Sequence, residues 1–324
     1  MALGLILALG GLGILIAAAG QFVKGAARLA VLYRVSPVVV GAVLIGFGTS
    51  APEMVVSGIA AGRGDLDIGV GNIIGSNVAN ISLVLAAATA VTVVPVDSRT
   101  VRREAPLSVA SVIVFALVLQ GRIERWEGAL LAGLILVVLV LALRAARGDD
   151  PLGEDVEVMI GDDPLYRGLE TVRVAGGLLA VVVSAWFIVE GAGRIADALD
   201  LSDGFVGFTL VALGTSAPEL VTSVQAARQG ETGLLVGNLL GSNVFNSLAV
   251  GGLVGLIGPG EILDTRLAGT GSMLMLVIVI TSWVFMVVGG EIDRRKGFVL
   301  FLLWVVSVVI LSGSDVADTA LSLG

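Results

Sequence analysis

Gly48-Thr49-Ser50-Ala51-Pro52-Glu53 returns 166 residues later as Gly214-Thr215-Ser216-Ala217-Pro218-Glu219. The same offset relates a second motif, which spans Gly71–Asn80 in the first half and Gly237–Asn246 in the second. Between Gly48 and Asn80, about 19 of the 33 aligned pairs are identical without a gap. A carboxylate is costly to keep in apolar surroundings, so a duplicated one marks a candidate functional position.

The composition predicts a polytopic membrane protein. The chain has 324 residues, of which 56% are hydrophobic and 14% charged, and its mean hydropathy is +1.01. Several apolar segments are long enough to cross about 30 Å of hydrocarbon. A net charge of −8 with no basic stripe argues against nucleic acid as a partner. The absence of Cys and His excludes disulfides, the usual zinc sites and imidazole relays. Any bound metal must be held by oxygen, which favours hard cations.

The hydropathy pattern predicts an all-α protein with ten transmembrane helices. We expect them at about 3–31, 36–62, 67–90, 104–120, 126–145, 169–199, 203–228, 232–257, 267–290 and 296–313. The apolar N-terminal stretch Leu3–Ala19 has no basic region before it, so we interpret it as part of the first helix rather than a signal peptide. Five helices per half is an odd number, so the two repeats must enter the bilayer in opposite orientations.

The domain organisation follows from the repeat. Residues 1–145 form the first five-helix repeat, residues 146–168 an acidic cytoplasmic linker, and residues 169–324 the second repeat. The linker spacing does not match an EF-hand loop, so a solvated linker is favoured over a regulatory Ca²⁺ site.

The distribution of basic residues predicts the orientation. Twelve fall in connections on one side: Arg34, Arg99, Arg102, Arg103, Arg144, Arg147, Arg167, Arg173, Arg228, Arg294, Arg295 and Lys296. Five fall on the other: Arg63, Arg122, Arg125, Arg194 and Arg266. The positive-inside rule therefore places both termini outside the cell membrane. Within the helices, Glu190 and Arg194 are spaced for a local salt bridge, and Lys24 and Arg28 are interpreted as interfacial anchors.

The second helix of each half is expected to be broken. Pro52 and Pro218 each remove a backbone N–H and clash with the carbonyl four residues earlier, which belongs to Gly48 or Gly214. A break in a membrane helix persists only where the freed groups are buried in protein or line a wet cavity. Carbonyls, Thr and Ser hydroxyls and one carboxylate then converge, which predicts an all-oxygen cation site.

The third helix of each half supplies the opposite wall. Asn72, Ser76 and Asn80 are spaced by four and share one helical face, which Asn238, Ser242 and Asn246 repeat. The glycines of the same motif, Gly71, Gly75, Gly237 and Gly241, allow the broken helix to approach closely. Such stripes also serve packing and interhelical hydrogen bonds, and for Asn77 and Asn243 packing is the favoured role.

The glutamates favour ion binding over packing. An unpaired buried carboxylate costs several kcal/mol or takes up a proton. The two motif cores contain no Lys or Arg that could neutralise Glu53 or Glu219, so a mobile cation or a proton is the natural partner.

With these residues in hand, the chain resembles the Ca²⁺/cation antiporter superfamily, whose α-repeats carry Gly-Thr-Ser-Ala-Pro-Glu followed by Gly-Asn-x-x-Gly-Ser-Asn once in each half. Within that superfamily it is most similar to the prokaryotic Na⁺/Ca²⁺ exchangers, over essentially the whole chain. The resemblance implies that Glu53 and Glu219 are shared carboxylates for Ca²⁺ and Na⁺. It further implies that the backbone carbonyls of Thr49 and Thr215 are ligands, with further carbonyls from Gly46 and Ala212. It implies that four serines help to hold Na⁺: Ser50, Ser216, Ser76 and Ser242. Asn80 also fits the family pattern.

One position departs from the family pattern. Well-known prokaryotic members carry Asp where this chain has Asn246, so both halves carry Asn and the site holds two carboxylates. Two negative charges match one Ca²⁺ or a pair of Na⁺. The departure bears directly on the coupling ratio and on the choice of ion.

The sequence thus predicts a secondary antiporter that exchanges Na⁺ for Ca²⁺ by alternating access, without a cofactor or an obligatory protein partner. H⁺/Ca²⁺ exchange is the alternative, although Thr-Ser before the glutamate offers hydroxyl ligands suited to Na⁺. A cation channel or a Ca²⁺ sensor is a rival of a different class, and the inverted repeat favours the transporter. No nucleophile–base pair or cofactor motif predicts an enzyme.

Overall fold

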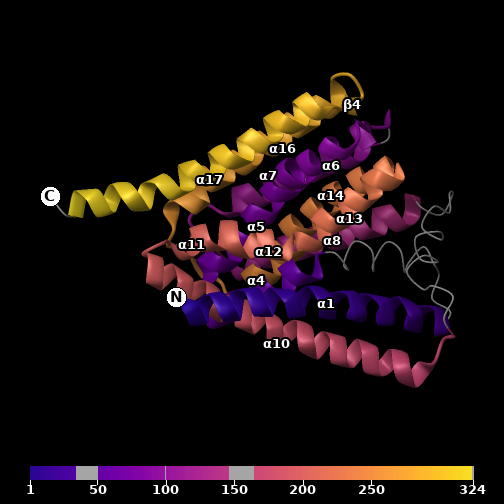
Figure 1. Ribbon diagram of the computed structural model, residues 1–324, viewed down its shortest axis with the longest axis horizontal. Coiled ribbons are helices and arrows are strands. Elements are labelled where there is room, and N and C mark those ends of the chain that lie inside the picture. Colours follow the sequence, from indigo (N-terminus) through magenta and orange to yellow (C-terminus); the bar gives the residue numbers. More distant parts are fainter. Residues whose placement is uncertain (34–49, 99, 146–163, 323–324) are drawn as a thin grey trace.

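The fold is mostly helical, and the computed structural model describes residues 1–33, 50–98, 100–145 and 164–322 (Figure 1). The first half contains α1 (Ala2–Leu32), α4 (Ala51–Arg63), α5 (Leu66–Ala79), α6 (Leu85–Val91), α7 (Ala105–Val118) and α8 (Arg125–Ala145). The second contains α10 (Arg167–Leu199), α11 (Asp203–Val206), α12 (Ala212–Thr215), α13 (Ala217–Gln229), α14 (Thr232–Phe245), α15 (Gly251–Ile257), α16 (Ser272–Val287) and α17 (Arg294–Ser322).

Short π-helical turns interrupt or extend several of these helices. They are η2 (Asn80–Val84), η3 (Thr100–Glu104), η4 (Gly207–Val211), η5 (Asn246–Val250) and η6 (Leu267–Gly271). Because η2 joins α5 to α6 and η5 joins α14 to α15, each of these pairs forms one continuous span. Such turns add a residue to the helical ladder and are frequent at functional sites.

The described helices make this a multi-spanning membrane protein. Seven of them are long and apolar enough to cross a bilayer, and the bent pair Asp203–Thr215 and Ala217–Gln229 makes an eighth. The span expected at 36–62 is described only from residue 50 onward. The last helix was expected to end near residue 313 but runs to Ser322, because the apolar pattern marks the membrane span and not the end of the helix.

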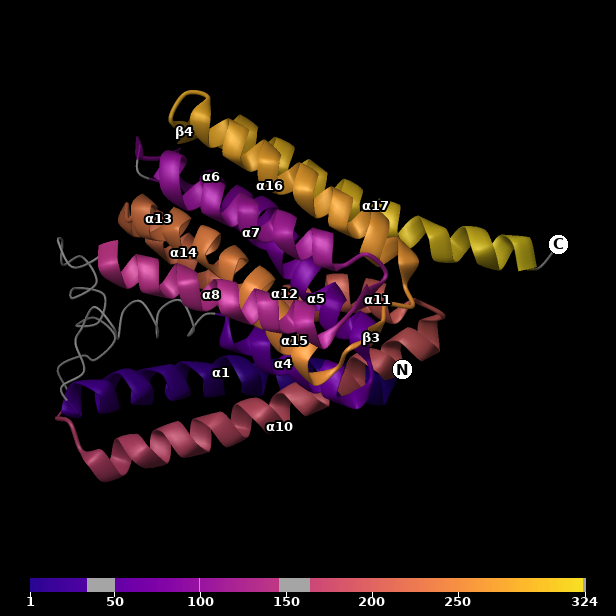
Figure 2. The same cartoon turned by 180° about the vertical axis from the view of Figure 1, so that it is seen from behind.

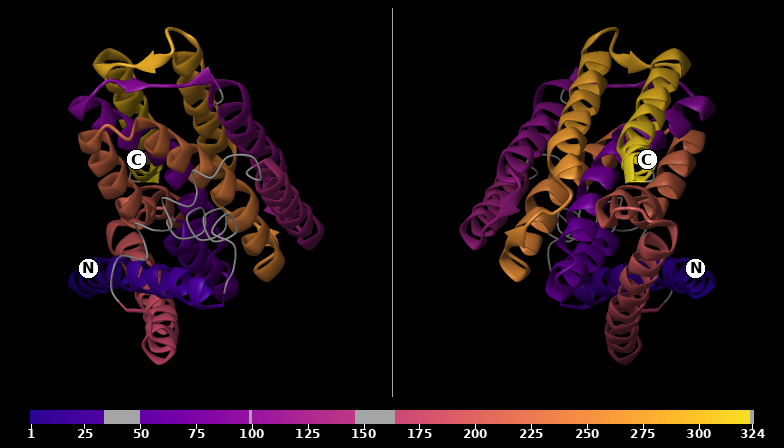
Figure 3. Two further views of the ribbon diagram at one scale, coloured as in Figure 1. Left: turned by 90° about the vertical axis from the view of Figure 1, so that its right-hand side faces the viewer. Right: turned by 90° about the vertical axis from the view of Figure 1, so that its left-hand side faces the viewer.

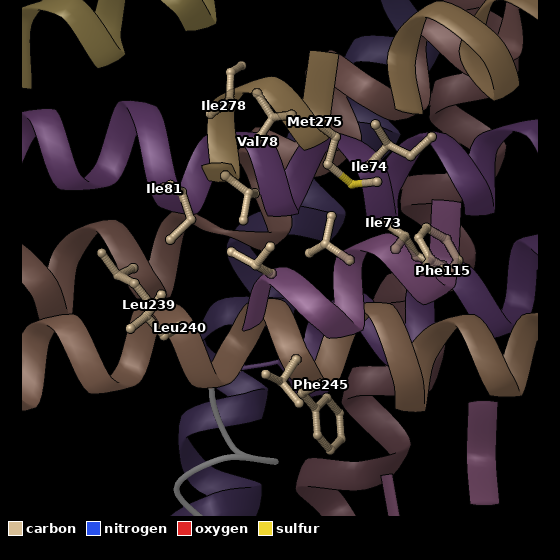
Figure 4. Packing of buried hydrophobic residues seen from close by; sticks show 14 of the residues in the cluster. Ile73, Ile74, Val78, Ile81, Phe115, Leu239, Leu240, Phe245, Met275 and Ile278 are labelled. Atoms are coloured by element: carbon tan, nitrogen blue, oxygen red, sulfur yellow. The ribbon is translucent and has the colours of Figure 1, made fainter. Parts of the chain in front are cut away.

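Two spans form the centre of the molecule. Leu66–Val91 and Leu235–Ile257 are 78% and 72% buried over their most apolar windows, against 17% for Arg125–Ala142 and 22% for Arg294–Ser312. The central core packs around them, with Ile73, Val78, Leu239 and Met275 among its side chains (Figure 4). Helices buried on all sides need not present apolar side chains to lipid, so they can carry the Asn and Ser residues of the second motif.

Four two-residue strands join the two halves at their loops. Strand β1 (Val94–Pro95) pairs antiparallel with β4 (Glu291–Ile292), and β2 (Arg122–Ile123) pairs with β3 (Gly260–Glu261). β3 lies 166 residues after β1, which is the offset of the sequence repeat. Figure 2 places β3 and β4 toward opposite ends of the central helices. Each pairing therefore closes one end of the bundle with one loop from each half.

Helices α1 and α10 form a two-helix layer along one edge of the molecule, seen in indigo and pink in Figure 3. They pack along most of their length with backbones in close approach. A Cβ added at Gly11 would lie 2.8 Å from the Ser184 carbonyl oxygen, and one at Gly177 would lie 2.9 Å from the Phe22 nitrogen. In lipid the hydrophobic effect does not drive helices together, so their association depends on the close packing that small residues allow. The two helices therefore behave as one unit.

Ion pairs fix both ends of this layer. At one end Glu170 is fully buried and accepts from Arg28 Nε and from Arg173 Nη1, both at 2.7 Å. The interpretation of Arg28 as an interfacial anchor is therefore wrong, because its side chain is buried between α1 and α10. At the other end Glu190 accepts from Arg194 Nε, as predicted, and from Arg63 Nη2 of α4, both at 2.8 Å.

Replacing Glu170 by Gln should destabilise the protein far more than replacing Glu190. Glu170→Gln removes the carboxylate that pairs with the buried Arg28, a loss of about 3–5 kcal/mol for buried pairs. Glu190 is 20% exposed and pairs with a half-exposed Arg194, so Glu190→Gln should cost about 1 kcal/mol or less. Melting temperatures of the two variants in detergent, compared with wild type, measure the difference. Equal shifts would contradict a structural role for the buried triad.

Candidate functional site

The break in the second helix of the second half lies at Ser216. α12 ends at Thr215, α13 begins at Ala217, and the two segments are bent by 46°. Ser216 has φ −84° and ψ 6°, and Ser50 before α4 has nearly the same conformation, φ −92° and ψ 8°. Pro52 and Pro218 each fall in the first turn of the helix that follows. Proline is tolerated there because those N–H groups have no intrahelical partner. The predicted break is confirmed for the second half.

Both glutamates lie at helix N-termini in the interior of the protein. Glu53 lies in the first turn of α4 and Glu219 in the first turn of α13, and both side chains are fully buried. The positive end of the helix dipole stabilises a carboxylate there by about 0.3–1 kcal/mol, which is less than the cost of burying the charge.

Glu53 is held by a hydroxyl from the other half of the protein. Ser216 Oγ donates to Glu53 Oε1 at 3.1 Å. Within the described part of the chain, Glu53 Oε2 is buried and has no hydrogen-bond partner. One carboxylate oxygen is thus positioned by the protein, and the second needs a partner from outside the described side chains.

Two further hydroxyls complete this cluster. Thr215 Oγ1 donates to Asn72 Oδ1 at 2.9 Å, and Ser76 Oγ lies 3.5 Å from Thr215 Oγ1. All of these side chains are fully buried. The structure therefore brings together Glu53, Ser76, Thr215 and Ser216 of the predicted set, two from each half.

The predicted asparagines lie farther along the central spans. Asn80 and Asn246 are the first residues of the π-helical turns η2 and η5. Asn80 Nδ2 donates to Asn243 Oδ1 at 3.3 Å, while Asn243 Nδ2 donates to the Asn77 carbonyl at 3.1 Å. Among the described residues, Asn80 Oδ1 and both amide atoms of Asn246 are buried without a hydrogen-bond partner. Leaving such groups unsatisfied costs about 1–3 kcal/mol each. Water is the expected partner of the amide nitrogen, and water or a cation of the two amide oxygens.

Asn77 makes the contacts expected of a packing residue. Its Nδ2 donates to Ser247 Oγ at 3.0 Å and approaches the Met275 sulfur at 3.5 Å. These contacts tie α5 to η5 and α16.

For the remaining predicted ligands, the structure gives burial or a single contact, and two of them lie outside the described residues. Ser50 Oγ is buried and has no hydrogen-bond partner among the residues that the structure describes. Ser242 is buried on α14. The carbonyl of Ala212 accepts the Ser216 N–H at 2.9 Å, so it takes part in the last turn of α12. Thr49 and Gly46 lie outside the described residues.

The donor set limits the chemistry. Across the described ranges, no three carboxylates come together as a metal cluster. A cation at Glu53 must therefore be held by one or two carboxylates together with hydroxyl, amide or carbonyl oxygens. Oxygen ligands of this kind suit hard cations such as Na⁺ and Ca²⁺.

Sequence reasoning missed the role of Ser57. It lies four residues after Glu53 on the same face of α4, and it accepts a hydrogen bond from Asn72 Nδ2 at 2.9 Å. Asn72 had been assigned to the polar face but not to the site. The available signal was the recurrence of Ser57 as Ser223 at the repeat offset.

The predicted close approach of the broken helix is confirmed for the second half. A Cβ on Gly71 would lie 2.5 Å from the Gly204 carbonyl oxygen. On Gly75 it would lie 2.6 Å from Ala212 Cβ and even closer to the Phe208 carbonyl oxygen. α5 therefore touches the backbone of the α11–η4–α12 segment. The segment expected against Gly237 and Gly241 falls in residues 34–49, outside the described part.

Gly75→Ala should disrupt this contact and lower both stability and ion binding. The new methyl meets the backbone, which cannot give way as a side chain can, so we expect a loss of about 1–3 kcal/mol or more. Gly133→Ala on α8 is the matched control. No atom lies within 4 Å of its added Cβ, and alanine favours the helix by about 0.5–1 kcal/mol. Thermal melting in detergent compares the two, and a stabilised Gly75→Ala would refute the close contact.

The fold is that of a membrane protein with a buried, oxygen-lined cluster between two related halves. The sequence profile of the sodium/calcium exchanger protein family matches residues 3–144 and 169–313, and the chain belongs to this family. The predicted membership of the Ca²⁺/cation antiporter superfamily is confirmed. Proteins of this family are transporters and not enzymes.

Similar proteins cover nearly the whole chain. CaxA of Alkalimonas amylolytica is 36% identical over 312 residues, covering 94% of this chain and 97% of its own length. The sodium/calcium exchanger MaX1 of Methanosarcina acetivorans is 29% identical over 93% of this chain and 96% of its own. Among solved structures, the sodium-calcium exchanger NCX_Mj soaked with Na⁺ and Sr²⁺ is 28% identical, with a TM-score of 0.64 over 95% of this chain and 98% of that one.

Proposed function

We propose that this protein exchanges Na⁺ for Ca²⁺ across the membrane by alternating access. The observation that carries the proposal is the fully buried carboxylate of Glu53, held by the Ser216 hydroxyl of the opposite half at a helix break. Its similarity to the sodium/calcium exchangers MaX1 and NCX_Mj supports the same function. In the proposed site, Glu53 and Glu219 serve both cargo ions, and Ser50, Ser76, Thr215, Ser216, Ser242, Asn80 and Asn246 add neutral oxygens, together with Thr49.

Competition for one set of ligands produces the exchange. Ca²⁺ and Na⁺ both require the glutamates, so the site holds one cargo or the other. An empty site leaves two buried negative charges in a low dielectric, which opposes movement of the unloaded protein. Either cargo neutralises these charges and permits the transition. The Na⁺ gradient then drives Ca²⁺ across the membrane.

The proposed architecture is ten transmembrane helices in two inverted repeats of five, residues 1–145 and 169–324. The equivalent conformations of Ser50 and Ser216 support it, as do the equivalent π-helical turns at Asn80 and Asn246. The paired loops at opposite ends, β1 with β4 and β2 with β3, also fit a two-fold axis in the membrane plane. The basic residues favour both termini outside and the linker 146–168 in the cytoplasm.

Movement is assigned to the layer of α1 and α10. The two helices pack closely on each other through glycines, and a separate apolar cluster that includes Leu15, Val56, Ala185 and Val211 lies between this layer and the helices of the site. Most of this interface is apolar, and the Arg63–Glu190 ion pair crosses it near one end. Apolar contacts can slide over one another with a low barrier, whereas this ion pair must break and re-form during the movement. The layer would then cover the site from one side of the membrane at a time.

The choice of coupling ion is tested by ⁴⁵Ca²⁺ uptake into proteoliposomes. We expect an outward Na⁺ gradient to drive uptake and an outward H⁺ gradient of equal size to leave it at background, because the site offers neutral hydroxyl oxygens beside the carboxylates. Uptake driven only by H⁺ would assign the protein to proton-coupled Ca²⁺ exchange. Ca²⁺ conductance without either gradient in a planar bilayer would indicate a channel.

Removing either glutamate charge should abolish exchange. Glu53→Gln and Glu219→Gln keep the side-chain volume but remove the charge shared by both cargo ions, so Na⁺-driven uptake should fall to that of protein-free vesicles. Glu124→Gln, at a 44% exposed carboxylate in a loop, is the matched control and should transport like wild type. Uptake retained by Glu53→Gln would contradict the assignment of the site.

A further inference from the structure

A chain of hydrogen bonds runs through buried side chains from a backbone carbonyl to the site. Ser57 Oγ donates to the Gly69 carbonyl oxygen at 3.1 Å, and Asn72 Nδ2 donates to Ser57 Oγ at 2.9 Å. On the other side of the same amide, Asn72 Oδ1 accepts from Thr215 Oγ1 at 2.9 Å. Ser57, Asn72 and Thr215 are all fully buried. The chain links α4 and α5 of the first half to the break in the second.

The direction of every donor in this chain is fixed by its first member. The Gly69 carbonyl can only accept, so the single Ser57 proton points to it. Ser57 can then only accept from Asn72, which turns the amide nitrogen toward α4 and the amide oxygen toward Thr215. The Glu53 carbonyl, 3.4 Å from Asn72 Nδ2, is also an acceptor and favours the same orientation.

This polarity decides what Thr215 can bind. A threonine hydroxyl has one proton and two lone pairs. Its shortest contact with an acceptor is the 2.9 Å contact with Asn72 Oδ1, so the proton points there. The lone pairs remain for Ser76 Oγ, 3.5 Å away, and for a ligand. The neighbouring hydroxyl is set in the same way, because Ser216 Oγ donates its proton to Glu53 Oε1. Two adjacent hydroxyl oxygens thus act as acceptors beside a buried carboxylate.

We propose that Ser57 and Asn72 are positioning residues which hold the Thr215 hydroxyl as an acceptor for the transported Na⁺. The inference rests on the proposed exchange function. It adds a hydrogen-bond relay from Ser57 through Asn72 to Thr215, in which Ser57 and Asn72 do not contact the ion themselves. Na⁺ carries one charge and depends more on neutral oxygens, whereas Ca²⁺ binding is dominated by the carboxylates. The relay therefore acts on Na⁺ binding more strongly than on Ca²⁺ binding.

Loss of the Ser57 hydroxyl leaves only the longer 3.4 Å contact with the Glu53 carbonyl to hold the amide nitrogen of Asn72, so the amide can reverse. Its nitrogen then donates to a lone pair of Thr215 Oγ1, and the Thr215 proton turns to the Ala212 carbonyl, which already lies 3.3 Å away. Thr215 loses an acceptor position that faced the cation. No atom that contacts an ion has been removed.

The repeat provides a matched control. The equivalent of Ser57 in the second half is Ser223, at the same turn of α13 and equally buried. Among the described residues, Ser223 Oγ has no hydrogen-bond partner, so the corresponding relay is not formed there. Ser57→Ala and Ser223→Ala therefore remove the same hydroxyl from equivalent buried positions, one inside a relay and one outside.

The test measures the Na⁺ concentration for half-maximal Na⁺-driven ⁴⁵Ca²⁺ uptake in proteoliposomes, with KM for Ca²⁺ measured in parallel. Ser57→Ala should raise this half-maximal Na⁺ concentration about five- to tenfold, which is the effect of one lost hydrogen bond. The same variant should change KM for Ca²⁺ about twofold or less. Ser223→Ala should change both by about twofold or less. Ser57→Thr restores a hydroxyl at the same position and should recover most of the Na⁺ dependence. Melting temperatures show whether each variant is folded.

A double-mutant cycle tests whether Ser57 acts through Thr215. Thr215→Val keeps the shape of the side chain and removes its hydroxyl, so Ser57→Ala added to Thr215→Val should have no further effect on the Na⁺ value. Equal effects of Ser57→Ala in both backgrounds, or equal effects of Ser57→Ala and Ser223→Ala, would overturn the relay. If Ca²⁺ uptake by the wild-type protein does not depend on Na⁺, the proposed exchange function itself is overturned. The wild-type measurement alone gives this result, before any variant is tested.

Discussion

The hydrogen bond between the Ser216 hydroxyl and the Glu53 carboxylate is the contact on which the rest of the structure depends. A buried carboxylate in the membrane interior needs oriented donors and a counter-charge. The donor comes from a helix break, and a break needs protein around it because lipid cannot satisfy freed backbone groups. That requirement explains the two central spans, which carry the polar residues inside a shell of apolar helices.

Close backbone contact is the second constraint. Ser216 reaches Glu53 only because α12 lies directly against α5, where Gly71 and Gly75 remove the side chains that would separate them. The same device, glycine against backbone, holds α1 to α10 on the outside of the bundle. Small residues therefore serve two purposes in one chain: they build a dense site, and they hold α1 and α10 together in one layer.

The two halves are related but not equal, and the differences are physical. Arg63 of α4 binds Glu190 of α10, whereas the equivalent positions in the other half are Gln229 and Lys24, which cannot form an ion pair. In an inverted repeat, the two access states exchange the roles of the halves. Under the proposed alternating access, a contact available to one half only would favour one state over the other. Ser57 and Ser223 differ in the same sense, since one is hydrogen-bonded within a relay and the other has no such partner among the described residues.

Much of this organisation was predictable because the constraints are local. The duplicated motif, the helix break next to Pro218, the close packing at Gly71 and Gly75 and the Glu190–Arg194 pair follow from residue spacing and backbone chemistry. The buried triad around Glu170 was not predictable, because Arg28 and Glu170 lie 142 residues apart and no local pattern shows that α1 and α10 bury them together. The π-helical turns at Asn80 and Asn246 were also missed, since an extra residue in a helical ladder leaves no trace in apolar periodicity.

The sequence by itself determined that this is a membrane protein with two related halves, each bringing one carboxylate into an apolar interior, because hydrophobicity and repetition are properties of the chain. Only the tertiary structure decided which oxygens meet. Thr215 could have turned its proton toward Ala212 or toward Asn72, and Asn72 could have presented either end of its amide. The choice comes from Ser57 and the Gly69 carbonyl, which reach Thr215 only when helices of the two halves pack together. Hydrogen-bond direction depends on neighbours in space, and the order of residues along the chain does not contain it.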